Sequence, residues 1–140
     1  MTHKLYLGLG SNLGNREENI RRALALIDER LGSVYRVSSF VETKPIGFSS
    51  PNHFINAACL VHTMMSPQAC LRETQKIERE LGRTQKSTLV DGELCHYDRI
   101  IDIDLLTYDD LHVTTPELTL PHPRMCERPF VMVPLEEIRQ

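Results

Sequence analysis

The sequence of 140 residues lacks several features that would assign a protein to a broad class. It has no apolar run long enough to cross a membrane, and its start, MTHKLYLG, lacks the apolar stretch of a signal peptide. Positive charge is not in excess, because 16 Lys and Arg stand against 19 Asp and Glu and give a net charge of −3. These absences argue against a membrane protein or a nucleic-acid-binding protein, and they predict a cytoplasmic location.

The sequence also lacks closely spaced cysteines, internal repeats and low-complexity linkers. Its four cysteines show no Cys-x-x-Cys pair and stand at Cys59, Cys70, Cys95 and Cys126. Zinc sites and disulfide frameworks need closer pairs, so we interpret these residues as buried or incidental thiols. With 41% hydrophobic and 25% charged residues, residues 1–140 are predicted to form a single domain with one core.

A recognised phosphate-binding loop is missing too, although the stretch GLGSNLGNR (8–16) holds three glycines. The third glycine comes one residue too late for the dinucleotide pattern G-x-G-x-x-G, and no Lys-Ser or Lys-Thr pair follows it. We interpret the stretch as a tight strand-to-helix turn in which Ser11, Asn12 and Asn15 satisfy backbone N–H groups. The alternative is a backbone segment that lines a ligand pocket.

What the sequence does contain is an alternation of strand and helix patterns. The predicted elements are a strand at 4–9, a helix at 17–31, strands at 33–43 and 53–63, a helix between Ser66 and Gly82, and a strand at 99–109. The tail is predicted to be mostly loop, with a short strand at PFVMVPL (129–135). This order matches a split β-α-β sandwich, in which both helices pack on one face of an antiparallel sheet.

The sharpest local signal is a pair of aspartates in RIIDIDLL (99–106). Residues two apart on a strand point to the same face, so Asp102 and Asp104 project together while apolar neighbours fill the other face. Adjacent carboxylates repel each other unless a cation lies between them, and Mg²⁺ is commonly held by one or two carboxylates plus substrate phosphates. The pattern predicts either a metal–nucleotide site or a charged, solvated strand face.

Further candidates lie along the chain, each with a structural alternative. Gln75 and Glu78 share a face of the second predicted helix, which by itself predicts a solvated surface. His122 lies between two prolines and is suited either to a structural role or to rigid contact with a phosphate. Phe54 is suited either to stacking on a flat heterocycle or to core packing. The aperiodic segment 83–98 is typical of a functional lid or of disorder.

In chain order, these motifs resemble the 6-hydroxymethyl-7,8-dihydropterin pyrophosphokinase family of the folate pathway. The resemblance covers nearly the whole chain and rests on GSNLGNR, ETKPIG, FINAA, TQKIERELGR, DRIIDIDLL and LPHPRMCERPFV. It implies an α+β, ferredoxin-like fold with helices packed on an antiparallel sheet. It also implies an enzyme that binds ATP with two Mg²⁺ ions and transfers pyrophosphate to the hydroxymethyl group of the pterin, with release of AMP.

The resemblance also implies a role for individual residues. It places the metal on Asp102 and Asp104. Contacts to the reacting phosphates are implied for Arg83, Arg99, His122 and Arg128, and contacts to the nucleotide for Gln75, Glu78, Lys86 and Thr119. Contacts to the pterin are implied for Thr43, Pro45, Ile46, Phe54, Asn56 and Phe130.

The sequence departs from the usual pattern of the family at two positions. His96 stands where a tryptophan is common, and Glu117 stands where an arginine can contact the nucleotide. Two other functions remain as alternatives: a non-catalytic module that binds a small molecule, and a metal-dependent phosphohydrolase. We expect a monomer, with a weak homodimer as the alternative, and no residue is assigned as a general base.

Overall fold

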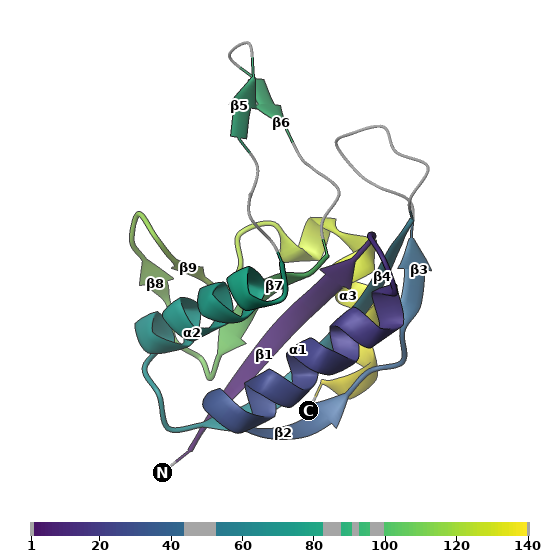
Figure 1. The fold of residues 1–140 in the computed structure, drawn as a ribbon. Helices are drawn as coiled ribbons and strands as arrows, with labels where there is room; N and C mark the ends of the chain where they lie inside the picture. Colours follow the sequence, from purple (N-terminus) through teal and green to yellow (C-terminus); the bar gives the residue numbers. More distant parts are fainter. Residues whose placement is uncertain (1, 44–52, 83–87, 91–92, 96–99, 140) are drawn as a thin grey trace.

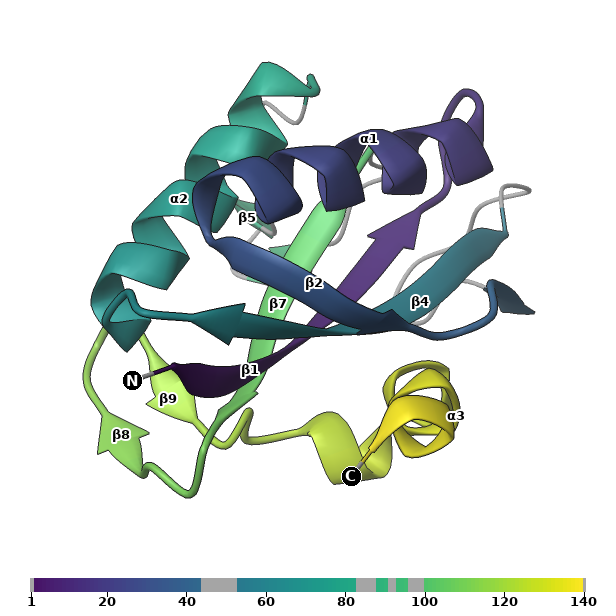
Figure 2. The same ribbon diagram turned by 90° about the horizontal axis from the view of Figure 1, so that it is seen from below.

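A five-stranded antiparallel sheet forms the centre of the protein, with helices on both of its faces (Figures 1 and 2). The structure is a computed structural model and describes residues 2–43, 53–82, 88–90, 93–95 and 100–139. Its elements are, in chain order, β1 (His3–Ser11), α1 (Arg16–Arg30), β2 (Gly32–Val37), β3 (Val41–Thr43), β4 (Phe54–Thr63), α2 (Pro67–Glu80), β5 (Thr88–Val90), β6 (Glu93–Cys95), β7 (Asp102–Tyr108), β8 (Val113–Thr114), β9 (Thr119–Leu120), a 3-10 turn (Met125–Glu127) and α3 (Pro129–Ile138).

The strand order confirms the predicted split β-α-β topology. The main sheet runs β2-β4-β1-β7, β3 also pairs with β4, and every pairing in it is antiparallel. The first β-α-β unit is therefore split by β4, which lies between β1 and β2. Among the described residues, no helix is both long and apolar enough to span a membrane.

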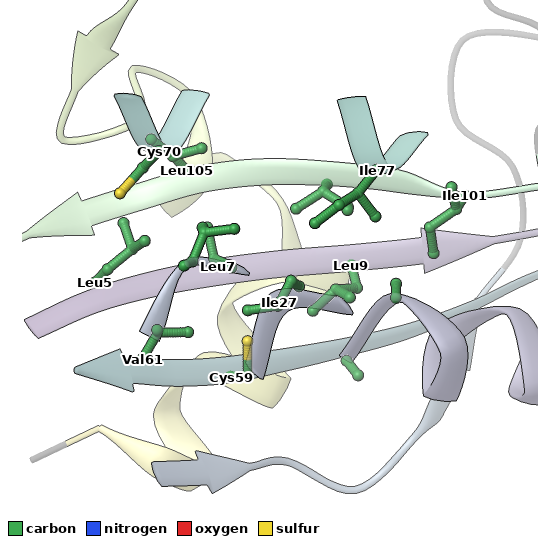
Figure 3. Close-up of a cluster of buried hydrophobic side chains, with 14 of the residues drawn as sticks. Leu5, Leu7, Leu9, Ile27, Cys59, Val61, Cys70, Ile77, Ile101 and Leu105 are labelled. Carbon is green, nitrogen blue, oxygen red and sulfur yellow. The ribbon is translucent and has the colours of Figure 1, made fainter. Parts of the chain in front are cut away.

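One face of the sheet carries the larger core, beneath α1 and α2 (Figure 3). Alternate residues of β1, β4 and β7 point to this face, including Leu7, Val61 and Leu105, and they meet Ile27 of α1 and Ile77 of α2. Each helix begins with a side-chain cap: Asn15 accepts the N–H of Glu18, and Ser66 accepts that of Ala69. The helix pattern in the sequence thus predicted the limits of these two helices.

The opposite face is covered by a third helix, and here the sequence-based prediction was wrong. Residues 129–135 were expected to form a strand, but they begin α3, which packs mainly against β4 (Figure 2). Pro129 stands at the first turn, where its missing N–H costs nothing. Val131, Leu135 and Ile138 recur at helical spacing and bury one side of the helix. The prediction failed because valines favour strands locally, whereas burial of this stripe favours the helix.

Two further segments differ from their prediction. The strand expected at 33–43 is interrupted at Ser38, whose N–H donates to the carbonyl of Ala58 and whose hydroxyl accepts the N–H of Ala58. The bend separates β2 from β3. Within the aperiodic segment 83–98, β5 and β6 pair with each other as a two-stranded sheet, and the remainder of that segment lies outside the described residues.

Candidate functional site

Gly8 and Gly10 both lie inside β1, which is longer than predicted: the expected strand at 4–9 included Gly8 but left Gly10 in the turn. The strand continues to Ser11, and the turn that follows contains Gly14, whose φ of 69° is in the left-handed region that favours glycine. Gly8 and Gly10 point to the face of the sheet opposite α1 and α2, because Leu7 and Leu9 between and beside them point to the larger core. Two adjacent positions of this face therefore carry no side chain.

The two aspartates stand directly beside these glycines. Asp102 pairs with Gly10 and Asp104 pairs with Gly8 across the β1–β7 ladder, and both aspartates are half-buried. Ile101, Ile103 and Leu105 alternate with them and fill the larger core on the other face. The prediction that the carboxylates project together is confirmed by this alternation.

The polar side chains of β4 stand on the other side of the same glycines. Asn56 pairs with Gly10 across the β1–β4 ladder and is 5% exposed. Its side-chain N–H donates to the Thr43 hydroxyl over 2.6 Å. A Cβ atom placed on Gly10 would lie 3.1 Å from Asn56 Oδ1 and 3.4 Å from Phe54 Cδ1. Gly8 and Gly10 form a surface without side chains, here called the glycine floor. A polar and aromatic group lies at its edge and consists of Thr43, Asn56 and Phe54.

Glu78 corrects the expectation of a solvated surface on α2. It is 2% exposed, and its Oε2 accepts the backbone N–H of Ile103 over 2.8 Å. Ile103 lies between Asp102 and Asp104, so Glu78 holds the strand at the point where it presents the two carboxylates. Because Glu78 accepts this hydrogen bond, the buried N–H of Ile103 does not incur the free-energy cost of an unsatisfied donor.

His122 reaches the same face from the segment after β9. Its backbone N–H donates to the carbonyl of Leu106 over 2.8 Å, which fixes it against β7. The N–H of Arg124 donates to His122 Nδ1, so Nε2 is left as the hydrogen-bond donor. Burial lowers the pKa of His122, the positive charges of Arg128 and Arg124 lower it further, and the negative charge of Asp102 opposes them. The lowered pKa favours the neutral form of His122.

These causes predict how the His122 pKa responds to its neighbours. In metal-free protein with EDTA, we expect an NMR titration midpoint below 6.5, which Arg128→Gln raises and Asp102→Asn lowers further. Arg139→Gln, at the exposed C-terminal end, should leave the midpoint unchanged. Because the folded pKa is lowered, stability should fall as the pH drops from 6.5 through the folded pKa. A midpoint unaffected by Arg128→Gln would contradict this placement of the two residues.

The start of α3 contributes the last members of the site. Phe130 packs against the cluster on this face of the sheet, and the Arg128 guanidinium carbon lies 5.7 Å from the centre of its ring. This distance is typical of a cation–π contact. The site thus extends from Phe54 and Gly10 to Asp102, which pairs with Gly10. The charges of Asp102 and Arg128 both act on His122, and Arg128 lies over the ring of Phe130.

The other predicted site residues divide into two groups. Gln75 is half-buried on α2, one turn before Glu78, and Thr119 is exposed on β9, three residues before His122. Five candidates lie outside the described residues: Pro45, Ile46, Arg83, Lys86 and Arg99. From the sequence, pocket lining by the glycine stretch was only the alternative to a turn, and Gly8 and Gly10 were not singled out as part of a site. Counting the alternation of the strand through GLGS would have singled them out, because it places both glycines opposite the apolar face.

The fold and this face define an α+β protein of the ferredoxin-like class with an acidic polar site beside two strand glycines. A model of the family described as 7,8-dihydro-6-hydroxymethylpterin-pyrophosphokinase (HPPK) matches residues 6–140. The chain belongs to this family, which confirms the resemblance inferred from the motifs.

Individual relatives agree with the family match. A 2-amino-4-hydroxy-6-hydroxymethyldihydropteridine pyrophosphokinase of Porphyromonas gingivalis is 47% identical over 135 residues, 96% of this chain and 89% of the relative. The enzyme of that name from Bacillus subtilis is 40% identical over 141 residues, 100% of this chain and 80% of the relative.

Solved structures support the fold. The Plasmodium falciparum HPPK-DHPS with pteroate has a TM-score of 0.75 at 16% identity, over 98% of this chain and 39% of that one. This chain thus spans about two fifths of the solved chain, and the likeness concerns the fold alone.

Proposed function

We propose that the protein transfers the pyrophosphoryl group of ATP to the hydroxymethyl oxygen of 6-hydroxymethyl-7,8-dihydropterin and releases AMP. The pterin hydroxyl oxygen bonds to the β-phosphorus and loses its proton to solvent. The bond between the β-phosphorus and the oxygen that bridges it to the α-phosphorus breaks, and this oxygen leaves with AMP. Family membership and the names of the relatives support this reaction. The alternatives, a non-catalytic binding module and a phosphohydrolase, gain no support from them.

One observation carries the assignment of the site: Asn56, Gly10 and Asp102 form a row across three neighbouring strands. Strands lie about 4.8 Å apart, so Asn56 and Asp102 are separated by roughly 10 Å of glycine floor. A pterin hydrogen-bonded to Asn56 and stacked on Phe54 would extend its hydroxymethyl group over Gly10. The phosphates would then lie on the side of the aspartates, His122 and Arg128.

The residues present fit Mg²⁺, the cation expected with ATP. Asp102 and Asp104 supply carboxylate oxygens on one face, and within the described ranges there is no group of three or more His, Cys, Asp or Glu that could hold a metal by itself. Mg²⁺ usually takes one or two carboxylates and completes its shell with phosphate oxygens and water. When bound, it would neutralise the charge of the phosphates.

The remaining side chains orient the substrates and stabilise charge. His122, neutral and protonated at Nε2, is suited to donate a hydrogen bond to a phosphate oxygen without needing an acidic pH. Arg128 adds a fixed positive charge and lies against Phe130, so it links the phosphate side of the site to the pterin side. Positioning and electrostatic stabilisation supply most of the rate in phosphoryl transfer.

A single assay tests the proposal. Purified protein is incubated with ATP, Mg²⁺ and 6-hydroxymethyl-7,8-dihydropterin, and AMP is measured. AMP that forms only when the pterin is present supports the pyrophosphokinase. ATP breakdown without pterin would indicate the phosphohydrolase, and pterin binding without turnover would indicate the binding module. Cytoplasmic location and the monomeric state stay predictions.

The aromatic side chains give a more specific test of the pterin site. We expect Phe54→Ala and Phe130→Ala each to weaken pterin binding by about 1 kcal/mol or more, roughly fivefold or more, because each removes a stacking surface. The affinity for ATP should change much less. Tyr35→Ala, which removes an exposed aromatic ring from β2, serves as the control. Isothermal titration with each ligand measures both affinities, and a loss that falls on ATP would place the pterin elsewhere.

A further inference from the structure

Arg16, the first residue of α1, links two strands that frame the candidate pterin residues. Its Nη1 donates to Glu42 Oε2 over 3.0 Å and to the backbone carbonyl of His53 over 2.8 Å. Glu42 belongs to β3, and His53 directly precedes β4. One guanidinium therefore holds the end of β3 and the start of β4 together.

Each of these acceptors is covalently adjacent to a candidate pterin residue. Glu42 precedes Thr43, whose hydroxyl accepts the side-chain N–H of Asn56. The His53 carbonyl belongs to the peptide bond that leads into Phe54. Movement of either acceptor would therefore move the hydroxyl or the ring that is expected to meet the pterin.

The geometry of the sheet shows that Arg16 acts from the other face. Thr43 pairs with Phe54, and Val41 pairs with Asn56, on the face that holds the aspartates. Glu42 pairs with Ile55, a residue of the larger core beneath α1. Arg16 therefore contacts the strands from the α1 side, whereas the pterin site lies on the opposite side of the same strands.

From this arrangement we infer that Arg16 is a positioning residue for pterin binding, an inference that rests on the proposed function. It touches no substrate, and it sets the placement of Thr43 and Phe54 through β3 and β4. The interaction is a partly exposed ion pair and contributes little to global stability. Small displacements of binding groups, in contrast, can have large effects on the affinity for the substrate that they hold.

The test compares Arg16→Gln with Arg22→Gln, which removes an exposed arginine of α1 that pairs with Glu18. We expect Arg16→Gln to raise the pterin KM about 5- to 20-fold, with kcat and the ATP KM within about twofold of the wild type. Arg22→Gln should change none of them. Arg16→Lys should restore only part of the affinity, because the lysine ammonium ends closer to the backbone than Nη1 and is more strongly hydrated than a guanidinium.

Several results would overturn the inference. An unchanged pterin KM in Arg16→Gln would do so. An equal rise in the ATP KM would also do so, as would a fall in thermal stability large enough to account for the loss of pterin affinity. If the wild type forms no AMP, the proposed function fails and amide hydrogen exchange in the ligand-free protein decides the inference. Faster exchange across β3 and the start of β4 in Arg16→Gln than in Arg22→Gln supports it, and equal exchange overturns it.

Discussion

Replacing Asp102 or Asp104 by alanine should abolish pyrophosphoryl transfer while the protein stays folded. Each substitution removes a carboxylate from the predicted Mg²⁺ site beside the glycine floor. A loss of several kcal/mol of transition-state stabilisation corresponds to about 10³-fold or more in kcat/KM. Both side chains are half-buried and lie outside the apolar clusters, so circular dichroism and the melting temperature should change little.

The control for this experiment is Asp110→Ala, which removes an exposed carboxylate just after the end of β7. It should keep normal activity. Asp102→Asn preserves the size of the side chain and removes its charge, so it should lose activity nearly as fully as the alanine variant. Normal turnover of either alanine variant at saturating Mg²⁺ would show that these aspartates hold no essential metal.

Replacing Gly10 by valine should reduce kcat/KM for the pterin by about 100-fold or more. The added Cβ would lie 3.1 Å from Asn56 Oδ1, so the Asn56 amide must move by a few tenths of an ångström, and 3.4 Å from Phe54 Cδ1, which is ordinary contact. The two methyl groups beyond it would fill the floor over which the reacting oxygen is expected to lie. A misplacement of about 1 Å at such a position can cost roughly 100-fold in rate.

The matched control is Lys4→Val, because Lys4 lies on the same strand and the same face as Gly10, at the exposed end. Its activity should match that of the wild type. Gly10→Ala should be intermediate, since it adds only the Cβ. Steady-state kinetics with each substrate, together with melting temperatures, separate the effect on the site from an effect on folding. Normal pterin kinetics in Gly10→Val would exclude the glycine floor from the site.

The sequence alone was sufficient for the features that depend on local periodicity. The helical pattern predicted α1 at 17–31, close to its observed limits, and predicted that α2 begins at Ser66, which caps it. The alternation in RIIDIDLL predicted that Asp102 and Asp104 share a face. These predictions succeeded because a strand or a helix repeats its side-chain directions at a fixed period, whatever the rest of the chain does.

Other features were decided by contacts between distant parts of the chain. Residues 129–138 carry valines that favour a strand, yet they form α3 because Val131 and Leu135 find an apolar partner in the cluster around Leu60. The burial of Glu78 depends on the backbone N–H of Ile103, which lies 25 residues further along the chain. The residues close to α3 or to Glu78 in the sequence do not show which distant groups they will contact. Neither result could therefore be predicted from periodicity.

The difference between what the sequence predicted and what the tertiary structure decided is greatest at the candidate site. The sequence predicted which residues would carry the chemistry: two aspartates on a strand, a histidine held between prolines, and aromatic and amide side chains in FINAA. Only the pairing of β1 with both β4 and β7 decided that Asn56 and Asp102 lie on either side of Gly10. The physical reason is that strand register sets neighbours across a sheet through long-range hydrogen bonds, whereas the period of one strand sets only the face to which each side chain points.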